Sequence, residues 1–265
     1  LINFEASGSR QVEGELRSYS IAEPVLSADV IINVPKMKTH MLTLYTGCIK
    51  NMYGAIPGFA KGRLHNLAPR PVPFSRHVVD VYSIVRPALH VMDAVVAMEG
   101  DGPSGGTPRS VGAIIAGTDP VAIDTIVAGM MGCRDGQVAT TRIAAAKGLG
   151  VSDRAGIEIM GETPASFDLD GFRLPGTAML NLIPGPLVRA LKPWIWIWPR
   201  MSIERGCRAE KCGLCVRSCP AEAIRMTGSG PVVDRKKCIE CLCCHEVCPE
   251  DAVEVRLSWL ARRLS

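Results

Sequence analysis

The chain has 265 residues, enough for one large or two modest domains; 47% are hydrophobic and only 5% aromatic, so an aliphatic core is expected. The formal net charge of +4 is too small to indicate nucleic-acid binding, and no run of about eighteen apolar residues is present that could form a transmembrane helix. The chain starts at Leu1 rather than Met, without a clear element boundary, so we expect an N-terminal part to be missing.

Residues 1–176 alternate between predicted strands and helices. Apolar runs predict four buried strands, at Ala28–Val34, Ala88–Met98, Val111–Ala116 and Gly156–Met160. Helices are expected from Pro120 to about Met131, with Asp119 as the N-cap, and over about residues 137–147, ended by Gly148. This alternation predicts an α/β domain, a parallel or mixed sheet with helices on both faces.

Residues 177–206 contain four prolines and are predicted to form a linker rather than a domain. Within them, Trp194, Trp196 and Trp198 alternate with a period of two. Tryptophan beside Arg or Lys favours lipid headgroups, so one interpretation is contact with a membrane surface. The interpretation that we favour is an extended segment whose tryptophans pack the following domain onto the main one.

Nine of the eleven cysteines lie between Cys207 and Cys248. They form two copies of one pattern, Cys207-x4-Cys212-x2-Cys215-x3-Cys219-Pro220 and Cys238-x2-Cys241-x2-Cys244-x3-Cys248-Pro249. This is the ligand spacing of a bacterial two-cluster ferredoxin. Residues 207–256 are therefore predicted to be a small α+β domain that holds two [4Fe-4S] clusters, and residues 257–265 a tail.

In two-cluster ferredoxins, the cysteine before proline ligates the cluster of the other motif. This assigns one cluster to Cys238, Cys241, Cys244 and Cys219, and the other to Cys212, Cys215, Cys248 and Cys207. A strict copy would place the first ligand at Ala209, so the first cluster has only three thiolates if Cys207 cannot reach it. Cys243, between two ligands, is interpreted as a small packed thiol.

Other uses of the cysteines are less consistent with the pattern. A disulfide scaffold would need a secreted chain, and no signal peptide is present. A zinc ribbon uses two Cys-x2-Cys pairs and needs neither the third cysteine nor the x3-Cys-Pro ending. Residues 207–265 contain ten Lys and Arg against eight Asp and Glu, so the module is expected to serve its own chain or an acidic partner. Reduced thiols and oxygen-sensitive clusters indicate the cytoplasm.

Charged residues follow the predicted strands of the α/β part. Lys36, Lys38 and His40 follow the first strand, Glu99 and Asp101 the second, and Thr118 and Asp119 the third. If the strands are parallel, these loops leave one edge of the sheet and line one cleft. There the lysines could hold a carboxylate or phosphate, Glu99 or Asp101 could be a general base or metal ligand, and His40 or His65 an acid–base group. The ordinary alternatives are a solvated lysine-rich loop, a turn, and a helix cap at Asp119.

Four stretches carry a resemblance to a known family: Pro35–His40, Thr46–Asn51, Glu99–Pro103 and Gly117–Asp124. Together they resemble the "domain of unknown function 362" family of iron–sulfur proteins, over most of residues 22–130. The resemblance implies a C-terminal two-cluster module, as in many members, and a further βα-containing portion before the start of this chain. The Gly47–Asn51 stretch and the loop after it are also loosely similar to lactate-racemase-type proteins.

These features predict an iron–sulfur oxidoreductase, or a subunit of one, whose two clusters exchange electrons with a site on the α/β domain. Residues expected at that site are Lys36, Lys38, His40, Lys50, Glu99 and Asp101. The partner would be a redox protein or a small anionic substrate. Two alternatives remain open: an electron carrier or adaptor without chemistry of its own, and a proton-transfer enzyme whose clusters are structural.

Overall fold

The computed structural model describes most of the chain, namely residues 1–4, 6–58, 60–68, 70–103, 105–176, 197–201, 207, 212–228, 230–239, 243–250 and 252–259. Within these residues, no helix is both long and apolar enough to cross a membrane.

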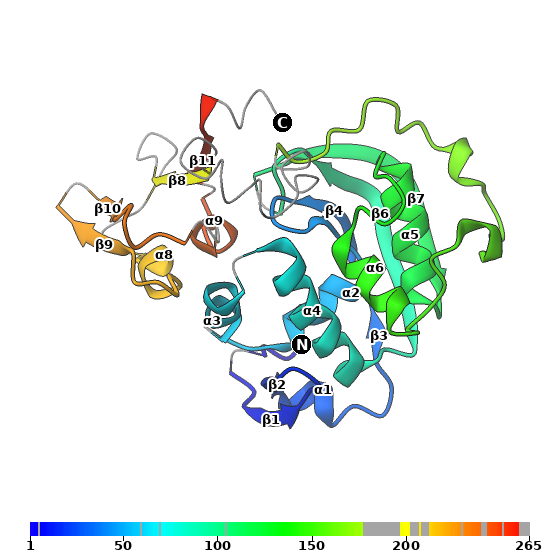
Figure 1. The fold of residues 1–265 in the computed structure, drawn as a ribbon, viewed down its shortest axis with the longest axis horizontal. Helices are drawn as coiled ribbons and strands as arrows, with labels where there is room; N and C mark the ends of the chain where they lie inside the picture. The colour runs from blue at the N-terminus through cyan, green and yellow to red at the C-terminus, as the bar shows by residue number, and fades with distance from the viewer. Residues whose placement is uncertain are drawn as a thin grey trace.

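The main sheet is built around β6 (Leu89–Glu99). Strand β7 (Thr107–Gly117) pairs with one edge of β6 in the antiparallel direction. The short strand β3 (Ile32–Asn33) and then β4 (Lys36–His40) pair with the other edge in the parallel direction, and β5 (Leu44–Thr46) continues the sheet antiparallel to β4 (Figure 1). The sheet is therefore mixed, and the predicted α/β class is confirmed.

Two of the four predicted strands are confirmed and two are not. The runs in 88–98 and 111–116 lie in β6 and β7. The prediction of a strand over Ala28–Val34 is wrong except at Ile32–Asn33, because Val30 points to solvent with 65% of its surface exposed. No strand forms at 156–160, where Met160 is 87% exposed and none of the described strands pairs with the segment. An apolar run forms a strand only where a neighbouring strand pairs with it.

The helices around the sheet include both predicted ones. Helix α5 (Pro120–Met130) begins as expected, with the Asp119 side chain accepting a hydrogen bond from the backbone N–H of Ala122. Helix α6 (Ala139–Ala146) stops shortly before Gly148, whose φ is +69°. The other helical segments are α1 (Glu23–Leu26), α2 (Cys48–Asn51), η1 (Met52–Ala55), α3 (Ala60–Leu67), α4 (Pro71–Val85), η2 (Arg154–Gly156) and η3 (Pro164–Ser166).

The core lies between the sheet and these helices. His90, Met92 and Ala94 alternate along β6 and are buried, and Met92 and Ala94 share an apolar cluster with residues of α5. The intervening residues point to the opposite face of the sheet. That face exposes several aliphatic side chains, namely Ile32, Val34, Val95 and Ile114.

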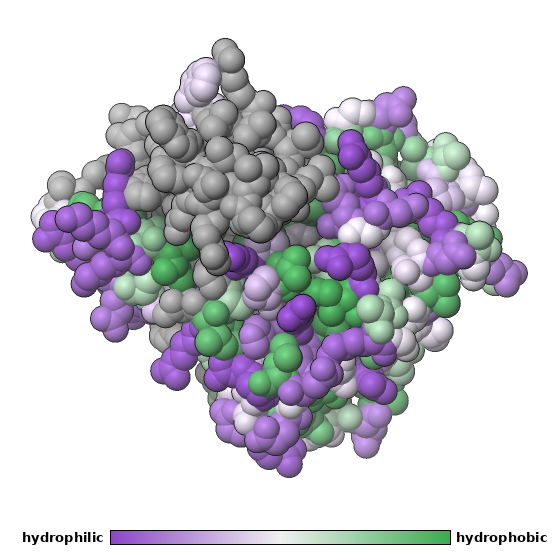
Figure 2. All heavy atoms as spheres, in the orientation of Figure 1, coloured by the Kyte–Doolittle hydropathy of each residue, from purple (hydrophilic) through white to green (hydrophobic). Residues whose placement is uncertain are grey.

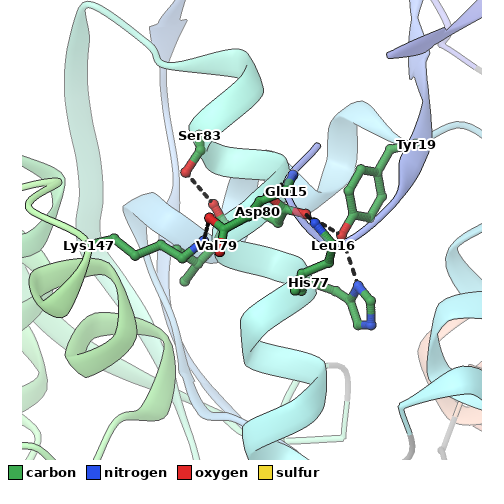
Figure 3. A network of polar contacts seen from close by, with 8 residues as sticks. All are labelled: Glu15, Leu16, Tyr19, His77, Val79, Asp80, Ser83 and Lys147. Carbon is green, nitrogen blue, oxygen red and sulfur yellow. Dashed lines mark hydrogen bonds and ion pairs between the residues drawn. The ribbon is translucent and has the colours of Figure 1, made fainter. Parts of the chain in front are cut away.

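An N-terminal hairpin of β1 (Ser9–Glu13) and β2 (Ser18–Ala22) is held against α4 by one buried carboxylate. Asp80 accepts hydrogen bonds from the backbone N–H groups of Glu15 and Leu16 and from the Tyr19 hydroxyl, at 2.8–2.9 Å (Figure 3). The Tyr19 hydroxyl also lies 2.8 Å from Nδ1 of His77. Burial and the Asp80 carboxylate raise the pKa of Tyr19, so this hydroxyl stays protonated and keeps the hairpin in place.

The C-terminal part forms the small α+β module that was predicted. It pairs β9 (Ile224–Thr227) with β10 (Gly230–Val233), and contains the one-turn helices α8 (Leu214–Arg217) and α9 (Cys243–Glu246). Strand β8 (Ile197–Met201) pairs antiparallel with β11 (Val253–Leu257), with Trp198 opposite Arg256. Residues 197–201 of the predicted linker thus form a two-stranded sheet with β11 of the module, separate from the β9–β10 pair. Trp194 and Trp196 lie outside the described residues.

Candidate functional site: two cysteine-lined cavities

The cysteines of the module line two separate cavities. The first cavity, of about 60 Å³, is lined by Cys207, Cys212, Cys215 and Cys248. The second cavity, of about 20 Å³, is lined by Cys219, Cys238, Cys243 and Cys244. Each cavity thus combines cysteines of one motif with the Cys-Pro cysteine of the other, which is the crossed arrangement that the spacing predicts. Cys241, the remaining predicted ligand, lies outside the described residues.

The two Cys-Pro cysteines have equivalent surroundings. The backbone N–H of Ala223 donates to Sγ of Cys219, and that of Ala252 donates to Sγ of Cys248, each at 3.2 Å. In both pairs the donor lies four residues after the sulfur. Hydrogen bonds of this kind stabilise a thiolate and set the reduction potential of an iron–sulfur centre. The internal repeat seen in the sequence is therefore also a repeat of local structure.

The walls between the cysteines are mostly apolar. Leu214, Met226 and Val253 line the first cavity, and Ile224 and Val233 line the second. Burial is the main reason that the pKa of Cys215 is raised, and the neighbouring thiols of Cys207 and Cys212 add to it. Clustered thiols in an apolar pocket release their protons when a cationic metal centre binds them.

The donor set fits cubane clusters. Among the described residues, no group of three or more His, Cys, Asp or Glu side chains could hold a metal ion between them. A cubane places its four thiolates on different irons, so the cysteines must surround a space instead of converging on one point. Four cysteines around one cavity, with Cys207 among them, have this arrangement.

The second cavity adjoins the α/β domain at two glycines. A Cβ added to Gly62 of α3 would lie 3.3 Å from the carbonyl oxygen of Ser218, beside Cys219. A Cβ added to Gly105 would lie 2.7 Å from Cε1 of His245, which follows Cys244 and donates through Nδ1 to the Val253 carbonyl. Glycine at both positions permits this close approach. The other end of the module, around β9 and α8, is hydrophilic (Figure 2).

The basic residues predicted for the α/β cleft lie on β4 and α2. Lys36 is half-exposed and its Nζ pairs with Asp93 Oδ2 at 2.8 Å. This hydrogen bond is the main reason that the pKa of Asp93 is lowered. Lys38 lies two residues along β4, opposite Met98, and Lys50 is a half-buried residue of α2. His40 is buried, and its Nδ1 accepts from the backbone N–H groups at 42 and 43, so the neutral ring carries its proton on Nε2.

These residues do not all meet. Lys36 is in register with Asp93, six residues before Glu99, which is roughly 20 Å along a strand. Of the residues of β4, only those from Lys38 to His40 lie beside the C-terminal end of β6, close to Glu99 and Asp101. Thr118 and Asp119 follow β7, which is antiparallel to β6, and Gly117 lies opposite His90 at the far end of the sheet. The expectation that all three loops leave one edge is therefore wrong.

Glu99 and Asp101 hold a returning segment of chain. Glu99 is buried, and it accepts from the backbone N–H and from Nε of Arg173, at 3.2 and 2.9 Å. Asp101 accepts from the backbone N–H of Gly176 at 2.9 Å. Burial raises the pKa of Glu99, but the bonds from Arg173 outweigh it and hold the pKa below its usual value. Both carboxylates thus anchor the segment that leads towards the module.

Replacing Glu99 with glutamine is expected to loosen this anchor. The amide keeps one acceptor but loses the charge that attracts Arg173, a change worth about 1–2 kcal/mol. We expect trypsin to cleave after Arg173 several times faster in the variant. Glu158→Gln, at an exposed glutamate, is the matched control and should leave the rate unchanged. Equal cleavage rates in the wild type and Glu99→Gln would show that the anchor has no energetic role.

A buried carboxylate that the sequence did not single out joins two of the motifs. Asp124 of α5 accepts from the Tyr45 hydroxyl and from the backbone N–H groups of Cys48 and Ile49, at 2.7–3.1 Å. Complete burial raises its pKa to about 6, against the lowering effect of these bonds. Any Cβ at Gly47 would overlap Tyr45 and Asp124. In the sequence, Asp124 could have been identified as the single charged residue of an otherwise apolar helix.

A second buried polar network lies beside it. The Asn33 side-chain amide donates to the Cys48 carbonyl at 2.8 Å and contacts Nδ1 of His90, while Asn51 donates to Asn33 Oδ1 at 2.7 Å. Burial lowers the pKa of His90, so the ring is neutral, and burial raises the pKa of the Cys48 thiol. Cys48 is therefore protonated and buried, and the Cys48–Asn51 stretch is held in place by these hydrogen bonds.

Comparisons with known proteins find a family match and several shorter similarities. Residues 1–129 match the model of a family described as Domain of unknown function (DUF362). The thylakoid-associated protein sll1697 of Synechocystis sp. is 30% identical over 161 residues, which are 60% of this chain and 50% of that protein. The chain thus spans half the length of this relative. No solved structure matches the chain.

Two shorter matches are to a component of an oxidoreductase complex and to a ferredoxin. One component of an ion-translocating oxidoreductase complex from Methanosarcina acetivorans is 42% identical over 53 residues, 20% of this chain and 19% of that protein. A ferredoxin from Methanothermococcus thermolithotrophicus is 37% identical over 51 residues, 19% of this chain and 85% of the ferredoxin. Residues 1–129 of this chain thus match the DUF362 family model, and a stretch of about fifty residues is similar to ferredoxins.

Proposed function

We propose that this protein binds two [4Fe-4S] clusters and exchanges electrons between a redox partner and the DUF362 domain. The observation that carries the proposal is the crossed grouping of the cysteines around two cavities, with matching N–H donors to Cys219 and Cys248. When bound, each cluster would take up and release one electron at a time. The ligands would be Cys207, Cys212, Cys215 and Cys248 for one cluster, and Cys219, Cys238, Cys241 and Cys244 for the other.

The surroundings of the two cavities support an order for electron transfer, in which one cavity faces the DUF362 domain and the other faces the redox partner. The second cavity adjoins Gly62 and Gly105 of the DUF362 domain, so its cysteines are the ones close to that domain. The hydrophilic end of the module carries exposed arginines, Arg217 and Arg225. Such a surface suits an acidic redox protein, which would exchange electrons through the first cavity. Free thiols at these positions require a reducing compartment, and we propose the cytoplasm.

A second candidate function, an electron carrier without catalysis of its own, is favoured by the position of the predicted catalytic residues. Glu99 and Asp101 are occupied in holding residues 173 and 176, and Lys36 lies far along the sheet from them. In this case the DUF362 domain would dock a partner enzyme. A Lys38→Gln/His40→Gln double variant separates the two functions, because catalysis at this end of β4 would be lost while cluster reduction would persist.

Anaerobic purification, followed by iron and sulfide counts and low-temperature electron paramagnetic resonance of the reduced protein, tests the proposal. We expect about eight irons and eight sulfides per chain, and an interacting pair of reduced-cluster signals. Zinc in place of iron would contradict the assignment. About four irons would show that only one set of cysteines holds a cluster.

A further inference from the structure

A third cavity lies in the α/β part, where the C-terminal end of α5 meets the N-terminal end of α6. Its volume is about 160 Å³. This is well above the roughly 10–15 Å³ that a cavity needs to hold one water, so it has room for several waters. This is the size of a small organic molecule. No cysteine of the iron–sulfur motifs lines it.

The cavity wall is rich in cationic groups. Arg134, Arg142 and Arg154 line it, against a single carboxylate, Asp135. Asp135 pairs with an amino group of Arg154 at 2.8 Å, and the Gly136 carbonyl accepts from Nε of Arg142 at 3.2 Å. These contacts hold two guanidinium groups in defined orientations. Guanidinium forks match the oxygens of phosphate and carboxylate groups.

The start of α6 adds backbone donors to the same wall, beside Thr141, whose hydroxyl oxygen is itself buried out of reach of the cavity. Helix α6 begins at the same wall, and no side chain caps its first turn, so its free N–H groups favour a negative charge.

Two further residues of the cavity wall, Cys133 and Gly129, favour the binding of an anion by the arginines. Burial raises the pKa of the Cys133 thiol at the floor to about 11, so the thiol is neutral and does not repel an anion. The Arg154 guanidinium rests on α5 at Gly129, where any Cβ would overlap it. The absence of a side chain at Gly129 therefore allows Arg154 to lie over the cavity.

We propose that this cavity binds a small phosphorylated metabolite, with the three arginines and the start of α6 around its phosphate. This binding site is separate from the cysteine cavities and from the predicted Lys38–Glu99 region. It goes beyond electron transfer, because it gives the DUF362-containing part a small-molecule ligand of its own. The site needs no bound iron.

Titration calorimetry of the anaerobically purified full chain with 3-phosphoglycerate tests the proposal, with citrate and glycerol as a carboxylate and a neutral probe. We expect 3-phosphoglycerate to bind more tightly than citrate, and glycerol not to bind. Arg142→Gln and Arg154→Gln should each weaken binding about tenfold or more. Gly129→Ala should weaken it without removing a charge, because it displaces Arg154.

The matched control is Arg76→Gln, at an exposed arginine of α4, which should bind as the wild type does. Equal weakening in this control would mean diffuse charge attraction and would overturn the site. Tighter binding of citrate would overturn the phosphate assignment, and no binding of any probe would overturn the site itself. Iron content and circular dichroism of each sample show that a loss of binding is not a loss of clusters or folding, which keeps this test independent of the proposed function.

Discussion

Replacing Cys215 with alanine is expected to lower the iron content from about eight to about four atoms per chain. Cys215 lines the first cavity together with Cys207, Cys212 and Cys248, and a cubane that loses one thiolate in this small pocket loses its hold on the chain. The second set of cysteines is untouched and should keep its cluster. Iron and sulfide counts of anaerobic samples measure the loss, and the interaction between the two reduced-cluster signals should disappear from the resonance spectrum.

Three further cysteine variants test this result. Cys207→Ala should give the same loss as Cys215→Ala, because Cys207 also lines the first cavity and is its fourth cysteine; a full iron complement would exclude Cys207 as a ligand. Cys243→Ala tests the ligand spacing, which assigns Cys244 and not Cys243 to the cluster although both line the second cavity, and it should retain all the iron. Cys133→Ala, in the α/β part, is the control. Unchanged iron in Cys215→Ala would contradict the ligand assignment.

Replacing Asp124 with alanine is expected to destabilise the α/β part by about 3–5 kcal/mol. Three buried donors, the Tyr45 hydroxyl and the N–H groups of Cys48 and Ile49, would lose their acceptor together. The midpoint of urea unfolding, followed by circular dichroism, measures the change. Asp29→Ala, at an exposed aspartate, is the control and should cost little.

The pH dependence of unfolding gives Asp124 a second signature. Its pKa is raised in the folded protein to about 6, from 3.8, so the folded state holds the proton more tightly than the unfolded state. The associated stability is present below about pH 4 and is lost as pH rises through about 6, an effect of about 3 kcal/mol. In Asp124→Asn this decline should be absent. A decline of the same size in the variant would assign it to other groups.

The cysteine module was predictable because its ligand spacing is local. Three cysteines in one short loop reach one cluster, so the pattern can be read without knowing the rest of the fold. Helix α5 was predictable for a similar reason, since Asp119 caps a turn only three residues away. The long apolar runs of β6 and β7 could also be recognised as strands from the sequence.

Strand direction could not be predicted in the same way. An apolar run is the same whether its strand lies parallel or antiparallel to a neighbour, and β6 and β7 are connected by a short loop that makes them antiparallel. That one fact moves Thr118 and Asp119 to the far end of the sheet from Glu99. It also explains why the cleft expected from a wholly parallel sheet does not form with all of its predicted members.

The sequence by itself determined the presence of two ferredoxin-type cysteine motifs, the α/β class and the family resemblance, because these rest on short-range spacing and periodicity. Only the tertiary structure decided which groups meet across long separations. Asp124 reaches Cys48 over 76 residues, and Gly62 and Gly105 bring the second cysteine cavity against the DUF362 domain. Such contacts depend on strand direction and on the missing side chains of glycines, which no local pattern encodes.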